Sequence, residues 1–105
     1  MPQVIFKGIN KDEAISFSSG LAKSLAEAIN CPKEWISIEL AQAEYFNLHS
    51  NEDAFPVVNI YWFARPKEVQ DKVAGIVKEY LFNQGYTQLQ VYFHRLDPNE
   101  YYEYK

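Results

Sequence analysis

Two helical stretches, each framed by two short strand-like runs, constrain the fold of this 105-residue chain more than any other feature. In both stretches apolar residues recur at spacings of three and four, which gives each helix one apolar stripe. The order is therefore βαβ followed by βαβ, in two halves of about fifty residues each. Strands are predicted at residues 2–8, 35–46, 55–64 and 89–94, and helices at 11–30 and between Pro66 and Gly85.

The ends of the first helix carry the usual boundary signals. Asn10 is suited to the N-cap position, and the acidic residues Asp12 and Glu13 lie in the first turn, where the helix dipole favours negative charge. The sequence Asn30-Cys31-Pro32 then ends the helix. Gly20 lies inside it and costs about 1 kcal/mol relative to alanine. We therefore expect another element to pack closely against Gly20.

This order of elements predicts an α+β domain spanning residues 1–105. Right-handed βαβ crossovers place both helices on one face of a single four-stranded mixed sheet. The strand at 55–64 is apolar on both faces, which is typical of a central, buried strand. Because one face of such a sheet has no helices, we expect something else to cover it, most simply a symmetric oligomer. The two apolar sets of that strand are Val58, Ile60 and Trp62 on one face and Val57, Tyr61 and Phe63 on the other.

Composition excludes several classes of function. A net charge of −4 and a pI near 5.1 argue against nucleic-acid or anionic-membrane partners, which need a basic surface. No apolar run approaches the roughly 20 residues of a membrane span, and no signal-peptide pattern is present. The single cysteine, Cys31, excludes an internal disulfide and suits a reducing compartment, so a cytoplasmic location is expected. His49 has no second ligand at a useful spacing, so neither a metal nor a cofactor is expected.

The sequence Met1-Pro2 carries a possible chemical function. If Met1 is removed, the nitrogen of Pro2 becomes a secondary amine. An apolar environment lowers the pKa of an amine, which lets it accept and return protons near neutral pH. The alternative is that Met-Pro has no chemical meaning here, because a dipeptide without its structural context is a weak motif.

Two βαβ halves, a proline at position 2 and an expected oligomer together resemble the tautomerase superfamily, which includes oxalocrotonate tautomerase and macrophage migration inhibitory factor. The segment 30–38 is similar to the turn that leads into the second strand of that family, and 91–97 is similar to its last strand. A closer resemblance, over the whole chain, is to a small bacterial branch of the superfamily that forms a domain of unknown function. Its recognisable segments are 44–46, 55–65, 69–71 and 101–102.

This resemblance implies a trimer and a catalytic role for Pro2 on an enolisable keto acid. The lysine of the family turn falls at Cys31, so that cation is missing and Lys33 is a nearby substitute. The pocket tyrosine, which a neighbouring subunit contributes, falls at Tyr92. The polar residue two positions further on falls at His94.

Each candidate also has a purely structural interpretation. Arg65 ends the central strand and is suited to bind a substrate carboxylate, or else it pairs with Glu68 or Asp71. Tyr92 can donate a hydrogen bond to an enolate, or it fills a subunit interface. His94 can serve as a second acid–base group, or it is a structural strand histidine.

Three functions remain open from the sequence. The first is a keto–enol tautomerase that binds a small carboxylate, with Pro2 as base and Arg65 as the substrate-binding cation. The second is a non-catalytic protein that binds a small ligand or a protein partner through the same fold. The third is a ferredoxin-like, RNA-binding sheet, which the acidic charge disfavours. The tail tyrosines Tyr101, Tyr102 and Tyr104 either pack on a neighbouring subunit or close the pocket.

Overall fold

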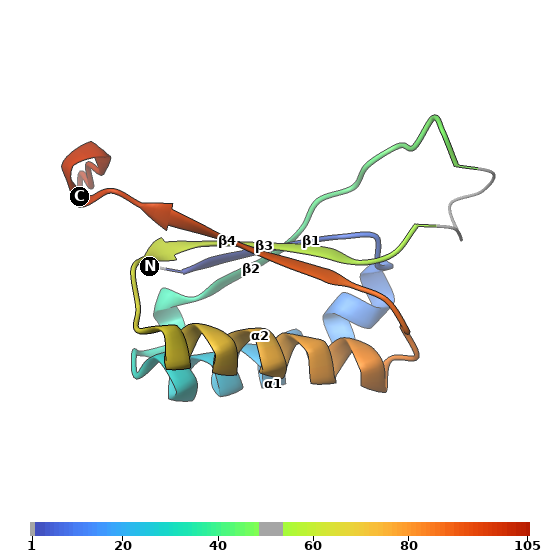
Figure 1. Ribbon diagram of the computed structural model, residues 1–105, viewed down its shortest axis with the longest axis horizontal. Helices are drawn as coiled ribbons and strands as arrows, with labels where there is room; N and C mark the ends of the chain where they lie inside the picture. The colour runs from blue at the N-terminus through green and yellow to red at the C-terminus, as the bar shows by residue number, and fades with distance from the viewer. Residues whose placement is uncertain (1, 49–53) are drawn as a thin grey trace.

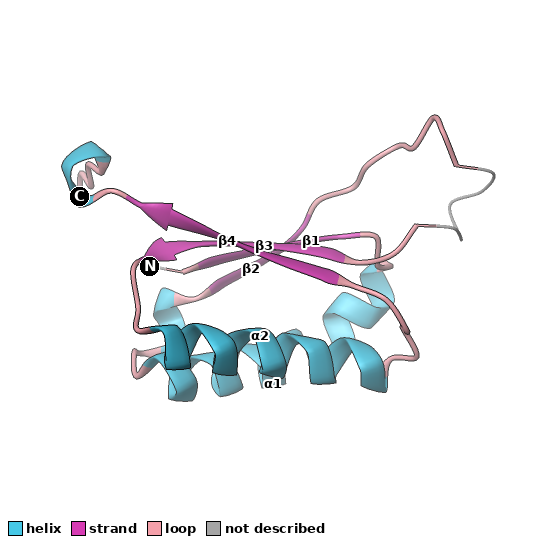
Figure 2. Cartoon of the chain, in the orientation of Figure 1, coloured by secondary structure: helices cyan, strands magenta, loops and turns pink. Residues whose placement is uncertain are grey.

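The computed structural model describes residues 2–48 and 54–105 (Figure 2). Met1 and residues 49–53, including His49, lie outside the described residues. The elements follow the predicted order, with two short 3-10 turns added. They are β1 (Gln3–Lys7), α1 (Lys11–Ile29), η1 (Lys33–Trp35), β2 (Ser37–Leu40), β3 (Val57–Phe63), α2 (Lys67–Asn83), β4 (Gln90–Leu96) and η3 (Pro98–Glu100).

The four strands form one mixed sheet in the order β2-β1-β3-β4. β1 pairs in parallel with β2, β3 pairs in parallel with β4, and the two halves meet through the antiparallel pair β1–β3. Both helices lie on the same face of this sheet, as Figure 1 shows. The predicted α+β architecture of two βαβ units is therefore confirmed.

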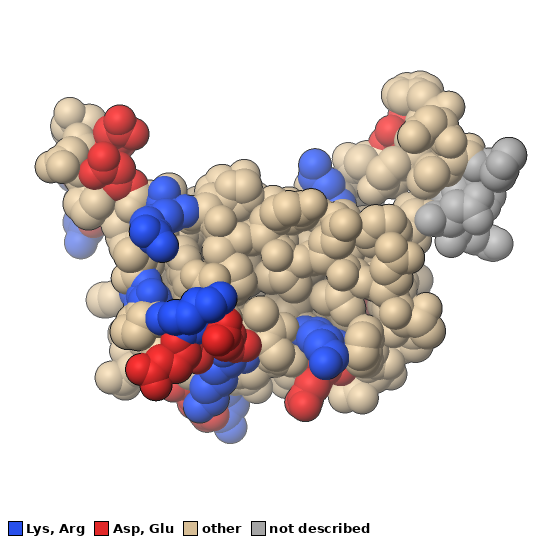
Figure 3. All heavy atoms as spheres, in the orientation of Figure 1, with Lys and Arg blue, Asp and Glu red and all other residues tan. Residues whose placement is uncertain are grey.

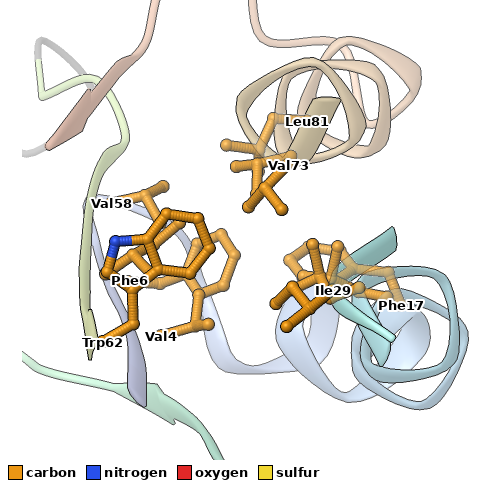
Figure 4. Packing of buried hydrophobic residues seen from close by; sticks show 12 residues of the cluster. Val4, Phe6, Phe17, Ile29, Val58, Trp62, Val73 and Leu81 are labelled. Carbon is orange, nitrogen blue, oxygen red and sulfur yellow. The ribbon is translucent and has the colours of Figure 1, made fainter. Parts of the chain in front are cut away.

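The core fills the space between the sheet and the two helices (Figure 4). In β3 the alternate residues Val58, Ile60 and Trp62 are buried against the helices. Each of the two inner strands thus contributes one complete face to the core, while its other face lies on the side without helices. The buried cluster comprises Val4, Phe6, Phe17, Leu21, Leu25, Ile29, Val58, Ile60, Trp62, Val73, Val77 and Leu81.

The two helices approach each other closely at Gly20. A Cβ atom added there would lie 2.9 Å from the hydroxyl oxygen of Tyr80 on α2. The same hydroxyl lies 3.3 Å from the Oγ atom of Ser24, one turn further along α1. The expectation of close packing at Gly20 is confirmed, and its reason is the Tyr80 side chain.

The predicted N-terminus of α1 is also confirmed. Asn10 Oδ1 accepts a hydrogen bond from the backbone N–H of Glu13 at 2.8 Å, and Glu13 Oε1 accepts one from the backbone N–H of Asn10 at 3.1 Å. Tyr86, in the connection between α2 and β4, donates a further hydrogen bond to Glu13. Burial and the adjacent Glu13 carboxylate raise the pKa of the Tyr86 hydroxyl. This contact holds the α2–β4 connection against the start of α1.

The predicted strand 35–46 is wrong in its extent, because β2 covers only Ser37–Leu40. Trp35 belongs to the 3-10 turn η1 instead. Beyond Leu40, the N–H of Ala41 still donates to the carbonyl of Phe6 at 2.8 Å, after which the pairing stops. A strand extends only as far as its partner, and β1 ends at Lys7.

The sheet face opposite the helices has no covering element among the described residues (Figure 1). Its β3 residues Val57, Asn59, Tyr61 and Phe63 are half-buried. The connection after β2 and the C-terminal segment both project on this side, at opposite ends of the sheet (Figures 1 and 3). We call this surface the open face.

Two fully buried prolines occupy equivalent places in the two halves. Pro2 precedes β1 and Pro56 precedes β3. The carbonyl of Pro2 accepts a hydrogen bond from the N–H of Ser37 at 3.1 Å, and the carbonyl of Pro56 accepts one from Gln90 at 3.0 Å. Each proline thus joins the start of one strand to the start of its parallel partner. Because the inner strands are antiparallel, the two prolines lie at opposite ends of the sheet.

Candidate functional site

The site begins at Pro2, which lies where β1 starts and β3 ends. The pairing of Gln3 with Tyr61, continued by one residue, places Pro2 beside Trp62. Both side chains are buried. The nitrogen of Pro2 lies on the side of the residue away from Gln3, toward the end of β3. Burial of this residue disfavours the charged form of an amine.

Arg65 lies at the same end of the sheet. Its guanidinium carbon is 5.8 Å from the centre of the Trp62 ring, a cation–π distance. One terminal nitrogen donates to the backbone carbonyl of Phe63 at 2.8 Å. Glu68 and Asp71 form no ion pair with it among the described residues, and Asp71 pairs with Lys67 at 3.0 Å instead. The backbone therefore holds Arg65 in place while other guanidinium N–H groups stay available to an anion.

Lys33 belongs to η1, which leads into β2 at the end of the sheet where Pro2 lies, and its side chain is directed to α1. Its Nζ atom lies 3.5 Å from Oγ of Ser19 on α1, and the side chain is exposed. The amine therefore borders the helix layer. The neighbouring Cys31 is half-buried at the C-terminal end of α1.

Tyr92 and His94 both lie on the open face. Tyr92 is 49% exposed, and its hydroxyl donates to Oε1 of Gln90 at 3.1 Å. The His94 ring stacks on Tyr61, with ring centres 4.2 Å apart, and its Nε2 atom lies 2.7 Å from Oδ1 of Asn59. An amide oxygen only accepts, so Nε2 donates this hydrogen bond. Both side chains thus lie on the uncovered side of the sheet, whereas the Pro2 ring is buried.

Two of the contacts at the site have no signal in the local sequence. Trp62 lies beside Pro2 only because of the β1–β3 register, and Asn59 meets His94 only because of the β3–β4 register. The tail adds a third contact. The ring of Tyr101 packs edge-on against Phe63, with centres 5.0 Å apart and planes at 87°. Among the described residues, no group of three His, Cys, Asp or Glu side chains is placed to bind a metal ion.

No helix within residues 2–48 and 54–105 has the length and apolar character that a membrane span requires.

The sheet order and the two helices define the fold of the tautomerases. Macrophage migration inhibitory factor of Toxoplasma gondii matches with a TM-score of 0.76 at 11% identity, over 96% of this chain and 95% of that one. A fused 4-OT described as an asymmetric trimer matches with a TM-score of 0.72 at 15% identity, over 90% of this chain and 85% of that one. These likenesses establish the fold alone.

The chain belongs to the family described as Domain of unknown function (DUF1904), whose model matches residues 1–105. A crystal structure of a DUF1904 domain from Sebaldella termitidis is 28% identical, covers 98% of this chain and 95% of that one, and has a TM-score of 0.89. The comparison with curated proteins gives no match. The predicted membership of a domain-of-unknown-function branch with the tautomerase fold is therefore confirmed.

Proposed function

We propose that the protein transfers a proton between carbon and oxygen of a small enolisable keto acid, with Pro2 as the base once Met1 is removed. The observation that carries this proposal is the position of Pro2, fully buried beside Trp62 at the end of the sheet where Arg65 also lies. Desolvation disfavours a charged amine, which keeps the base in its proton-accepting form near neutral pH. The tautomerase fold supports the same reading.

In this reaction the neutral amine of Pro2 takes the proton from the carbon next to the ketone. The electron pair of that C–H bond forms a carbon–carbon double bond, the π pair of the carbonyl moves to its oxygen, and the protonated amine of Pro2 gives its proton to that oxygen to form the enol. The reverse sequence regenerates the ketone and the free amine, so no co-reactant is consumed. Arg65 binds the substrate carboxylate. Because its guanidinium is already held by the Phe63 carbonyl and the Trp62 ring, little side-chain freedom is lost on binding.

The proposal includes a homotrimer. The apolar residues Val57, Tyr61 and Phe63 on the open face need cover, and a fused 4-OT with this fold is described as a trimer. In such an assembly a neighbouring subunit supplies Tyr92 to the Pro2 end. Replacing Val57 with Glu should then reduce the molar mass measured by light scattering. Ile15, an apolar residue of α1 that is 65% exposed, provides the matched control, because Ile15→Glu should leave the mass unchanged.

The test of the chemistry compares four forms of the chain. These are the processed form that begins at Pro2, a form that retains Met1, Pro2→Ala and Pro56→Ala, each identified by intact mass. The assay follows deuterium incorporation next to the ketone of phenylpyruvate by NMR. We expect activity only in the processed wild type and in Pro56→Ala, which alters an equally buried proline whose nitrogen always stays in a peptide bond. Undiminished activity in Pro2→Ala would exclude Pro2 as the base.

One observation favours a non-catalytic binding protein as the second candidate. Cys31 stands where the family lysine lies, and the nearby Lys33 amine is directed to Ser19 on the helix layer. A site with Arg65 as its cation still binds a carboxylate in this case. The two candidates differ in the assay, because a binding protein shows saturable carboxylate binding that Arg65→Gln weakens, without deuterium exchange in the processed form.

A further inference from the structure

The N-terminal strand β1 is one of the two inner strands of the sheet. It pairs in parallel with β2 from Gln3 to Phe6 and antiparallel with β3 from Gln3 to Lys7. Chain ends are usually mobile unless they are tied down, for example as a strand within a sheet. Here the pairing on both sides begins at Gln3, directly after Pro2.

Pro2 itself is held by burial and by a hydrogen bond. Its side chain is fully buried, and Val4, the next residue on the same side of β1, is 1% exposed. The carbonyl of Pro2 accepts a hydrogen bond from the N–H of Ser37 at 3.1 Å. An enzyme that acts on the peptide bond before Pro2 would first have to open the Ser37 contact and the pairing of Gln3, which exposes the Pro2 ring to water.

The proposed catalysis depends on the cleavage of that bond. A methionine aminopeptidase adds water across the amide between Met1 and Pro2: the C–N bond breaks, the hydroxyl group goes to the carbonyl carbon of Met1, and the hydrogen goes to the nitrogen of Pro2. Such an enzyme takes the start of its substrate into its own active site, so the start of β1 must leave the sheet. In the folded chain, cleavage is therefore limited to the small population in which this part of β1 has opened.

The nascent chain presents the same bond differently. β1 leaves the ribosome first, whereas its antiparallel partner β3 ends at Phe63, about 60 residues later. At about 5–20 residues per second, synthesis of this stretch takes about 3–12 s. During this time β1 has no antiparallel partner, and the bond before Pro2 is accessible to an enzyme. Pairing with β3 then ends this period.

We propose that Met1 is removed only before β1 pairs with β3, so that each chain acquires the free amine of Pro2 during its synthesis or not at all. A chain that folds with Met1 attached is protected and keeps the nitrogen of Pro2 in a peptide bond. Competition between the aminopeptidase and folding then sets the proportion of chains with a free amine. This inference rests on the proposed function for its effect on activity, because it concerns how the proposed base is generated.

The test makes the full chain by cell-free translation, with peptide deformylase but without methionine aminopeptidase. The aminopeptidase is added either at the start of synthesis or after the chains are complete and folded, and intact mass gives the fraction that retains Met1. A control chain begins with Met-Pro-Gly-Ser-Gly-Ser ahead of Pro2, which presents the same bond outside the folded domain. We expect complete removal in the first case and, in the second, removal at least about tenfold more slowly than from the control.

Three variants locate the barrier. Val4→Ala removes apolar contacts of β1, whereas Val73→Ala removes similar contacts of α2 from the same core. Folded Val4→Ala should lose Met1 several-fold faster than folded Val73→Ala, because it loosens the strand that holds the bond. Val57→Glu, which the proposed trimer should not tolerate, should be protected as the wild type is, because the pairing of β1 lies within one subunit. Circular dichroism checks that each variant is folded.

Removal of Met1 from the folded wild type at the rate of the control chain would overturn the proposal. Equal rates for Val4→Ala and Val73→Ala, or rapid removal in folded Val57→Glu, would do the same. Because the readout is mass, these results do not depend on whether Pro2 catalyses a reaction. A chain processed during synthesis that shows no deuterium exchange contradicts only the proposed catalysis, whereas a folded chain that is processed late and then becomes active contradicts only the present inference.

Discussion

The hydrogen bond of Tyr86 connects the segment between α2 and β4 to the start of α1, and its contribution to stability can be measured. The Tyr86 hydroxyl donates to Glu13, a residue 73 positions earlier that also completes the capping box of α1. Tyr86→Phe removes this hydrogen bond and keeps the ring. Hydrogen bonds to charged groups contribute about 1.5–3 kcal/mol, and partial exposure of this pair reduces that figure to about 1 kcal/mol. For a chain of this length, 1 kcal/mol lowers the melting temperature by about 4–5 °C.

The pH dependence of this stabilisation follows from the raised pKa of Tyr86. Burial is the largest cause, followed by the hydrogen bond and the negative charge of Glu13. The folded state therefore holds the hydroxyl proton more tightly than the unfolded chain, whose tyrosine pKa is about 10. The stabilisation is fully present below pH 10 and is lost as the pH rises above it. The difference between the wild type and Tyr86→Phe should shrink accordingly in alkaline solution.

The measurement is urea unfolding at pH 7 and at pH above 10, followed by tryptophan fluorescence at one fixed protein concentration. Tyr104→Phe is the matched control, because Tyr104 is 90% exposed and its hydroxyl forms no hydrogen bond with any described residue, so we expect no measurable loss. A double-mutant cycle with Glu13→Gln should give a coupling energy of about 1 kcal/mol. Equal unfolding midpoints for the two Tyr→Phe variants at pH 7 would refute the reasoning.

Three glycine substitutions make separate predictions for the same unfolding assay. Gly75→Ala should stabilise the protein by up to about 1 kcal/mol, because alanine favours the helix and nothing lies within 4 Å of the added Cβ. Gly20→Ala should stabilise the protein less than Gly75→Ala does, or should destabilise it, because the Tyr80 hydroxyl must move. An equal increase in the free energy of unfolding for both variants would contradict the close contact at Gly20. Gly8→Ala should cost more than about 1 kcal/mol, since φ is +82° and the new Cβ collides with the Phe55 carbonyl; a neutral effect would show that this turn is not constrained.

The sequence predicts what short-range patterns encode. The apolar stripe and Asn10 place α1 within one residue, and the alternation around Val58 and Trp62 identifies the central strand. The length of β2 escapes such reasoning, because residues after Leu40 still alternate while β1 has already ended. Alternation of apolar and polar residues thus shows that a segment can form a strand, whereas the length of the neighbouring strand determines how many of its residues pair.

The site is less predictable for a related reason. Pro2 and Arg65 are recognisable as candidates, but the position of Pro2 beside Trp62 follows from the pairing of β1 with β3, and the Asn59–His94 hydrogen bond follows from the pairing of β3 with β4. Register depends on all the strands together, so a single segment does not reveal which side chains meet.

The two buried prolines have a consequence for how the chain can be rearranged. They occupy equivalent positions in the two βαβ halves. Removal of Met1 frees the nitrogen of Pro2 and leaves the rest of the chain in one piece. Hydrolysis of the bond before Pro56 would free that nitrogen too, but it would divide the chain in two. A circular permutant that starts at Pro56 and joins residue 105 to Pro2 would reverse this asymmetry. The basic nitrogen would then lie at the opposite end of the sheet, beside Gly8 and away from Arg65. In the proposed mechanism, the location of the basic nitrogen in this scaffold thus depends on where the polypeptide is cut.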